Sequence, residues 1–145
     1  MKPKPIVRMH SAEHLLTALM KHLFGSPRNL EMHLGVKKTK CDYGVAHPLS
    51  DEEISAIETA VNAEIKKDHA VMVQTVPIEN ATTVDLWKVP KETTAIRIVR
   101  IGNFDATPCS GEHVSHTRQI GRFRVKSFTM KDERIVRIRF TLEED

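Results

Sequence analysis

Apolar residues recur along the chain with two different periods, and each period predicts a different kind of element. From Ser11 to Phe24 the apolar positions fall every three or four residues, which is typical of a helix with one buried face. The apolar residues of this segment are Leu15, Leu16, Leu19, Met20 and Leu23. Residues 25–27 (Gly-Ser-Pro) follow directly and are predicted to end the helix, because glycine and proline favour positions just beyond a helix C-terminus.

A second helix is predicted to begin after a capping box at residues 50–53 (Ser-Asp-Glu-Glu). In this motif the serine side chain accepts a hydrogen bond from the backbone N–H three residues on, and the glutamate reaches back to the serine N–H. The apolar residues that follow at helical spacing are Ile54, Ile57, Val61 and Ile65. Lys66 and Lys67 then place positive charge at the C-terminal end, where the helix dipole favours it.

Alternation of apolar and polar residues predicts strands that each bury one side. Residues 30–36 and 41–46 flank a basic turn and are expected to form a hairpin. Further strands are predicted at 70–76, 95–101, 121–128 and 135–142, and the polar segment 78–87 is predicted as a short helix or an irregular excursion. About three helices and five to seven strands in no regular order indicate an α+β fold, with a mixed or antiparallel sheet and two main helices.

Length and composition are consistent with one globular domain. The chain has 145 residues, enough for one sizeable core, so residues 1–145 are expected to form a single domain. Apolar residues make up 40% of the chain and charged residues 28%, the mean hydropathy is -0.33, and the longest apolar runs are far too short to span a membrane. The basic N-terminal residues precede no apolar stretch, so no secretory signal is expected, and the protein is predicted to be cytoplasmic.

Two pairs of potential metal ligands lie at opposite ends of the chain. His10 and His14 are four residues apart and are expected at the opening turn of the first predicted helix, so both rings lie on one helix face. Cys109 and His113 form a second pair with the same spacing. Histidine nitrogen and cysteine sulfur suit zinc, and the two pairs together predict one zinc site. The thiol of Cys109 is therefore interpreted as a metal ligand and not as half of a disulfide, and Cys41 as a small, half-buried residue at a strand end.

The net charge of +3 is unevenly distributed, because the C-terminal quarter of the chain is strongly basic. Arg122, Arg124 and Lys126 occupy alternate positions and are expected on one face of a strand, and Arg137 and Arg139 repeat the pattern on the last strand. A basic stripe of this kind suits contacts with RNA phosphates. An ordinary solvated sheet face has the same pattern, so both interpretations stay open.

The order of several motifs resembles the editing domain shared by alanyl- and threonyl-tRNA synthetases, and in particular the free-standing short alanyl-tRNA editing proteins. The motifs are H-S-A-E-H-L-L at 10–16, E-x-x-x-N at 58–62, I-V-R-I-G at 98–102, C-S-G-E-H-V at 109–114, residues 117–121, and Arg137-Ile138. They occur in the family's order with comparable gaps, and they span nearly the whole chain.

The resemblance implies a metal-dependent hydrolase that removes a wrongly attached amino acid from tRNA. The family's metal ligands match His10, His14, Cys109 and His113, and the implied reaction is attack of water on the ester that joins the aminoacyl group to the terminal ribose. The expected substrate is seryl- or glycyl-tRNA(Ala). The second motif resembles C-G-G-T-H in alanine-type proteins and C-R-G-P-H in threonine-type proteins. Residues 109–113 depart from both at their second and fourth positions, which leaves the choice of amino acid open.

Side chains beside the two ligand motifs are candidates for chemistry and selectivity. Glu13 and Glu112 each precede a ligand histidine, so each is a candidate general base or partner of a ligand, or else an exposed glutamate without a role. A pocket that hydrogen-bonds a serine hydroxyl would disfavour alanine. Thr17, Ser110 and Thr117 are the candidates for that contact.

Two other functions fit parts of the sequence. Residues 10–14 also spell H-x-x-E-H, the motif of inverted zinc proteases, in which the glutamate activates water for peptide cleavage. A zinc-stabilised tRNA-binding or adaptor domain without turnover is the second alternative, and Ser110 and Glu112, which depart from the family motif, favour it. Aminoacyl-tRNA is the expected partner, no membrane association is expected, and the sequence predicts no oligomeric state.

Overall fold

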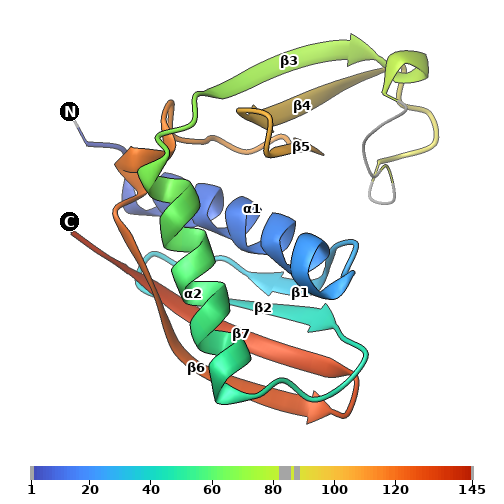
Figure 1. Cartoon of the computed structure of the whole chain (residues 1–145). Coiled ribbons are helices and arrows are strands. Elements are labelled where there is room, and N and C mark those ends of the chain that lie inside the picture. The colour runs from blue at the N-terminus through green and yellow to red at the C-terminus, as the bar shows by residue number, and fades with distance from the viewer. Residues whose placement is uncertain (1, 82–85, 87–88, 145) are drawn as a thin grey trace.

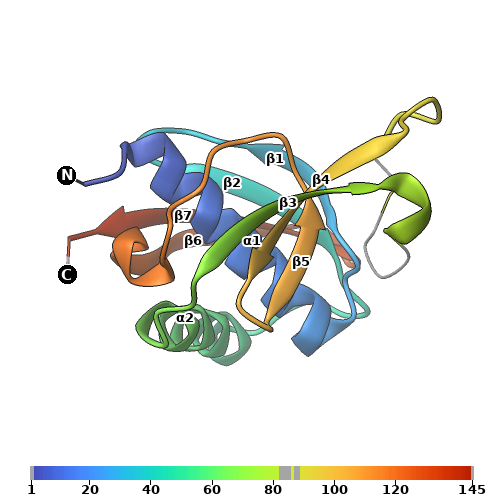
Figure 2. The same cartoon turned by 90° about the horizontal axis from the view of Figure 1, so that it is seen from above.

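Helix α1 (Pro5–Phe24) runs between two antiparallel sheets, so the molecule is built in layers (Figures 1 and 2). The structure is a computed structural model that describes residues 2–81, 86 and 89–144. The other elements in these residues are β1 (Asn29–His33), β2 (Thr39–Gly44), α2 (Asp51–Lys66), β3 (Val71–Pro77), β4 (Ala95–Ile101), β5 (Asp105–Pro108), β6 (Arg122–Asp132), β7 (Ile135–Glu143) and the short 3₁₀ helices η1 (Ile78–Asn80) and η2 (Thr117–Ile120). No helix of the described residues is both long enough and apolar enough to cross a membrane.

The strands pair into two separate sheets. One sheet has the order β1-β2-β7-β6, and the other has the order β3-β4-β5. The pairings are antiparallel in both sheets, so the predicted α+β class with two main helices is confirmed. β1 and β2 form the predicted hairpin, and β2 also pairs with β7, which joins the two ends of the chain in one sheet.

The start of α1 differs from the sequence-based prediction, because the helix begins at Pro5 and not at Ser11. Proline fits the first turn, since its fixed φ suits a helix and its missing N–H would have no partner there. Val7 and Met9 extend the buried face toward the helix start. His10 therefore lies inside the helix and not in its opening turn.

Both long helices pack on one face of the four-stranded sheet and share a hydrophobic core with it. The fully buried side chains of this core include Leu15, Leu16, Met20, Ile57, Val61, Phe123, Val136, Ile138 and Phe140. The rings of Phe123 and Phe140, on neighbouring strands, have centroids 4.8 Å apart. Because side chains alternate along a strand, the buried positions of β7 turn Arg137 and Arg139 toward the opposite face of the sheet.

Polar contacts fix α2 at both its start and its middle. The predicted capping box is present: Ser50 Oγ accepts a hydrogen bond from the Glu53 N–H at 3.2 Å, and Glu53 Oε1 accepts one from the Ser50 N–H at 2.9 Å. The Asn62 side chain bonds both the N–H and the carbonyl of Phe123 at 2.9 Å, and Glu58 accepts a hydrogen bond from a β6 backbone N–H at 2.7 Å. The E-x-x-x-N motif thus fastens α2 to β6.

Strand β5 is the element that the periodicity of the sequence does not predict. Its four residues, Asp-Ala-Thr-Pro, carry no apolar alternation, and pairing with β4 is what holds them extended. For residues 78–87 the sequence predicts either a short helix or an irregular excursion. The structure has the 3₁₀ helix η1 at Ile78–Asn80. Residues 82–85 and 87 lie outside the described residues.

Candidate metal centre and its cavity

The four predicted ligands converge, although they come from opposite ends of the chain. His10 and His14 extend from neighbouring turns of α1, and Cys109 and His113 belong to the loop after β5. The donor atoms of the four side chains all lie within 4.8 Å of one another. Cys109 Sγ is 3.5 Å from Nε2 of both His10 and His113. Tetrahedral zinc ligands at about 2.0–2.3 Å from the ion lie roughly 3.3–3.8 Å apart, so these three donors already have a suitable spacing.

The protonation of the histidines also fits a metal site. Burial and, to a lesser extent, the neighbouring His10 together lower the pKa of His14 to about 3. Burial is also the main reason that the pKa values of His10 and His113 lie below the ordinary value. The rings are therefore neutral at pH 7, which is the form that binds metal. His14 Nδ1 is buried without a hydrogen-bond partner among the described residues, and a buried nitrogen of this kind is stabilised by coordination.

Ser11, the residue between His10 and Ala12, orients a ligand from the other end of the chain. Its Oγ lies 3.0 Å from His113 Nδ1 and accepts a hydrogen bond from the Val114 N–H at 3.0 Å. Contact at Nδ1 leaves Nε2 of His113 facing Cys109, which is the orientation a metal ligand requires. Only the folded chain brings Ser11 to His113, so sequence reasoning misses this role.

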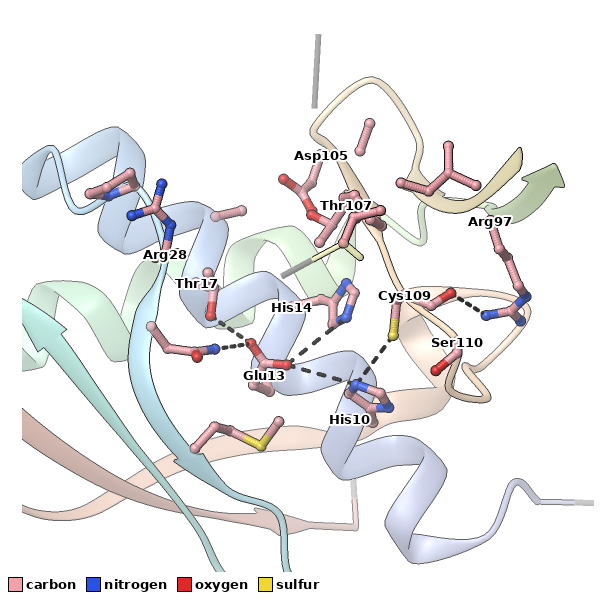
Figure 3. Close-up of a pocket in the computed structure, with 18 of the residues that line it drawn as sticks. His10, Glu13, His14, Thr17, Arg28, Arg97, Asp105, Thr107, Cys109 and Ser110 are labelled. Atoms are coloured by element: carbon pink, nitrogen blue, oxygen red, sulfur yellow. Dashed lines mark hydrogen bonds and ion pairs between the residues drawn. The ribbon is translucent and has the colours of Figure 1, made fainter. Parts of the chain in front are cut away.

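Glu13 is buried beside the ligands, so its interpretation as an exposed helix glutamate is wrong. Its Oε1 lies 3.9 Å from Nε2 of both His10 and His14. Its Oε2 accepts hydrogen bonds from the Thr17 hydroxyl at 2.6 Å and from Asn29 Nδ2 at 3.1 Å. Figure 3 shows this carboxylate between Thr17 and the two histidines. Glu112, by contrast, is exposed.

A cavity of about 490 Å³ opens beside the ligands (Figure 3). His10, His14 and Cys109 form part of its wall, which is built from α1, β1, β4 and β5. Three cationic side chains on the wall, Lys21, Arg28 and Arg97, are not among the residues that the sequence pattern singles out. The volume suits a small organic ligand, and the charged side chains in an otherwise largely apolar wall suit a ligand that carries charge.

The three hydroxyl residues considered for selectivity have different positions. Thr17 and Ser110 line the cavity. Thr117 lies elsewhere in the buried interior: its hydroxyl contacts the carbonyls of Glu64 and Ile65 at 3.3 and 3.2 Å and accepts a hydrogen bond from the His69 N–H at 2.9 Å. Thr117 therefore fixes the chain after α2 and does not reach the cavity.

Asn29 is a cavity residue that no motif indicates. Its side chain is 8% exposed, and its Nδ2 donates to Glu13, which orients the amide. Its Oδ1 is buried and has no hydrogen-bond partner among the described residues. A residue of the cavity wall therefore carries a buried acceptor without a partner, and acceptors of this kind are normally satisfied by a hydrogen bond.

The basic stripe lies on the side of the four-stranded sheet that faces away from the helices. Arg122, Arg124 and Lys126 are exposed on β6, and Lys126 sits at a bulge between Val125 and Ser127. Because α1 lies on the other side of this sheet (Figure 1), the stripe and the ligands of α1 are on opposite sides of the sheet.

Arg137, the remaining candidate for RNA contact, is engaged within the protein. Its Nε donates to Asp42 Oδ1 at 2.8 Å, and its Nη2 donates to Asp42 Oδ2 at 3.0 Å. A second ion pair, at 3.4 Å, joins it to Glu31. Its guanidinium thus balances a buried carboxylate on β2.

Comparison with known proteins finds relatives among the alanine–tRNA ligases. Residues 96–139 match the family described as the threonyl and alanyl tRNA synthetase second additional domain. The chain is 27% identical over 137 residues to alanine–tRNA ligase of Treponema denticola, in a match that covers 92% of the chain and 23% of the ligase. It is 30% identical over 121 residues to alanine–tRNA ligase of Xanthomonas campestris, in a match that covers 81% of the chain and 14% of the ligase. It is 31% identical over 125 residues to alanine–tRNA ligase of Idiomarina loihiensis, with 84% of the chain and 14% of the ligase covered. The chain thus spans less than a quarter of the length of these ligases.

Proposed function

We propose that this chain, whose residues 96–139 belong to the second additional domain family of threonyl and alanyl tRNA synthetases, hydrolyses the ester bond of a wrongly charged aminoacyl-tRNA. The observation that carries the proposal is the meeting of three histidines and one cysteine beside a cavity of about 490 Å³. The kinship with alanine–tRNA ligases supports tRNA as the partner. Residues 1–145 acting as one editing domain, and a cytoplasmic location, remain predictions.

His10, His14, Cys109 and His113 would hold the metal, and their nitrogen and sulfur donors favour zinc. A divalent zinc bound there supplies Lewis acidity toward an ester carbonyl or a water molecule. Aminoacyl esters are labile, so the site has to lower a smaller barrier than a peptidase does.

Glu13 is better placed than Glu112 to handle a proton in this reaction. Its Oε1 faces the ligand nitrogens at 3.9 Å, while its Oε2 is held by Thr17 and Asn29. A carboxylate that is held at one oxygen and has its other oxygen 3.9 Å from the ligand nitrogens has the geometry of a general base. Glu112 is exposed and does not line the cavity.

A seryl group fits the cavity better than a glycyl group does. The unpartnered Asn29 Oδ1 would accept a hydrogen bond from the serine hydroxyl, and Ser110 lies in the same wall. Glycine and alanine leave this buried acceptor unpaired, which disfavours both. Among the substrates expected from the resemblance, seryl-tRNA(Ala) is therefore the preferred one.

The direct test incubates metal-replete protein with seryl-, glycyl-, alanyl- and threonyl-tRNA and follows release of the amino acid. We expect seryl-tRNA to be deacylated fastest and alanyl-tRNA to be spared. The Cys109→Ala variant should lose zinc and deacylation together, whereas His116→Ala, at an exposed histidine beyond the ligand loop, should retain both. Aminoacyl-tRNA that stays charged in every reaction would contradict the proposal.

A zinc-stabilised tRNA-binding or adaptor domain is the second candidate, and one observation favours it. Four protein ligands fill all tetrahedral positions, and closed zinc sites are usually structural. This candidate predicts tRNA binding without deacylation, and unfolding when the metal is removed. The peptidase alternative receives less support, because the partners of His10 and His14 are Cys109 and His113 and not a distant glutamate.

A further inference from the structure

Arg97, on β4, contacts the ligand loop, residues 109–113, which carries Cys109 and His113. Neither the zinc motif nor the family motifs indicate this contact. Its Nη1 donates to the carbonyl of Cys109 at 2.7 Å and to the carbonyl of Gly111 at 2.8 Å. The backbone of the same residue accepts a hydrogen bond from the Cys109 N–H at 3.1 Å. Figure 3 shows the Arg97 side chain directed at this loop.

The loop needs such support because residues 109–113 belong to no helix or strand. Each residue of an irregular segment that is held in one conformation loses backbone entropy, so ligands on a loop are well placed only where other contacts fix the loop. Gly111 packs so closely on the His10 ring that a Cβ at this position would overlap it. A small shift of the loop would therefore disturb a ligand from α1 as well.

The loop is held at two points that lie on different elements. Ser11 of α1 holds its far end through His113 and the Val114 N–H. Arg97 of β4 holds its near end through the carbonyls of Cys109 and Gly111. The Gly111 N–H donates to Cys109 Sγ at 3.3 Å, so the stretch that Arg97 holds also orients the sulfur.

We infer that Arg97 is a positioning residue that preorganises Cys109 and His113 for a metal ion, by holding the backbone between them with its guanidinium. The metal in this inference rests on the proposed function. The ordering of the loop by Arg97 does not depend on that function. Groups that orient metal ligands typically contribute 10- to 100-fold to metal affinity, so removal of the guanidinium is expected to weaken zinc binding by about this factor.

The test compares Arg97→Met and Arg97→Lys with Arg100→Met. Arg100 lies on the same strand, is exposed, and contacts Gln74 through its Nε at 3.4 Å, so its variant is the matched control. Zinc affinity is measured by competition with a chromophoric chelator, and the cobalt(II) absorption spectrum reports the coordination. We expect Arg97→Met to lose about 10- to 100-fold in affinity with an altered cobalt spectrum, and the lysine variant, which keeps one donor, to lose less.

A metal-free measurement separates this inference from the proposed function. Amide hydrogen exchange of residues 109–114 in metal-free protein should accelerate in Arg97→Met relative to residues 51–66 of α2, and should not do so in Arg100→Met. Unchanged exchange in the loop, or equal acceleration in loop and helix, overturns the positioning role. Failure of the parent protein to bind zinc would overturn the metal site of the proposed function, while the exchange result would still decide the role of Arg97.

Discussion

Single side chains set the character of the cavity, and their roles follow from what each one contacts. Glu13, Ser11 and Asn29 all lie next to the ligands and all are buried. All three are paired with other protein groups, and Asn29 also carries a buried Oδ1 without a partner among the described residues. Removal of the Asn29 or the Ser11 side chain therefore has a specific expected effect.

Asn29→Ala should reduce discrimination between seryl- and glycyl-tRNA. Without the buried Oδ1, the serine hydroxyl loses its acceptor, and the hydrogen bond is worth about 0.5–1.5 kcal/mol, or roughly 2- to 13-fold in rate ratio. The measurement is kcat/KM for both substrates with the variant and its parent. An unchanged ratio would exclude Asn29 from amino-acid selection. Glu31→Ala, on the exposed outer side of the same strand, is the control.

Ser11→Ala should weaken both stability and metal affinity. The Val114 N–H and His113 Nδ1 lose their common partner, and an unsatisfied buried donor destabilises the fold by about 1–3 kcal/mol. Zinc affinity should fall by about 10-fold, because the His113 ring loses its orientation. Urea unfolding and chelator competition measure the two effects. Ser115→Ala, whose hydroxyl donates to the exposed Gln119, should change neither by a comparable amount.

At the scale of elements, charged side chains on the outer face of the four-stranded sheet divide into two groups. Asp42 on β2 is buried and bonded to Arg137 on β7 and to Lys131 on β6, so these charges join three strands. The Arg124 side chain on β6 is 48% exposed, and its ion pair with Glu143 on β7 is long, at 3.4 Å. The first group holds the sheet together, and the second is available to an external phosphate.

Asp42→Asn should lower stability at neutral pH and leave it nearly unchanged in acid. Burial alone would raise the pKa of Asp42, but hydrogen bonds and charges from Arg137 and Lys131 outweigh burial and leave that pKa below its usual value. A depressed pKa in the folded state stabilises the fold above the unfolded pKa of about 3.9, and this stability is lost as pH falls through the folded pKa. Urea unfolding should show a difference of about 1.5–3 kcal/mol at pH 7. A difference that persists undiminished at pH 2 would contradict this explanation.

Arg124→Ala should weaken tRNA binding in a salt-dependent manner. Loss of one phosphate contact should reduce the slope of log affinity against log salt by about 0.9 and leave zinc content intact. Arg137→Ala, by contrast, should mainly destabilise the sheet, because it removes one of the two cationic partners of the buried Asp42. Equal salt slopes for Arg124→Ala and the parent would show that this face does not contact RNA.

For the whole molecule, the question is whether the metal supports the fold or only the site. The main core lies between the two helices and the four-stranded sheet and is built from hydrophobic side chains. The ligands instead join α1 to the loop after β5, beside the smaller sheet. The fold is therefore expected to persist without metal.

Removal of zinc with a chelator should abolish deacylation and leave the far-ultraviolet circular dichroism unchanged. Binding at free zinc near 100 times the dissociation constant stabilises a fold by about 2.7 kcal/mol, so the melting temperature should fall by roughly 5–10 °C. Cooperative loss of all secondary structure at 25 °C would instead favour the zinc-stabilised adaptor.

The sequence by itself determined the α+β class, the position of α2 and its capping box, and the kinship with the synthetase domain, because helix caps, apolar periods and ordered motifs are local properties of the chain. It also indicated His10, His14, Cys109 and His113, since residue type and spacing identify candidate ligands. Whether these four bind metal remains a prediction.

Only the tertiary structure decided what surrounds those ligands. Arg97, Ser11 and Asn29 contact residues that are far away in the sequence or in another element, so no local pattern records their partners. The same holds for β5, which is extended because β4 pairs with it, and for the basic stripe, whose direction depends on which side of the sheet the helices cover. The alternation of apolar and polar residues indicates that a strand has two different faces. The packing of the whole chain decides which face lies toward the cavity and which toward solvent.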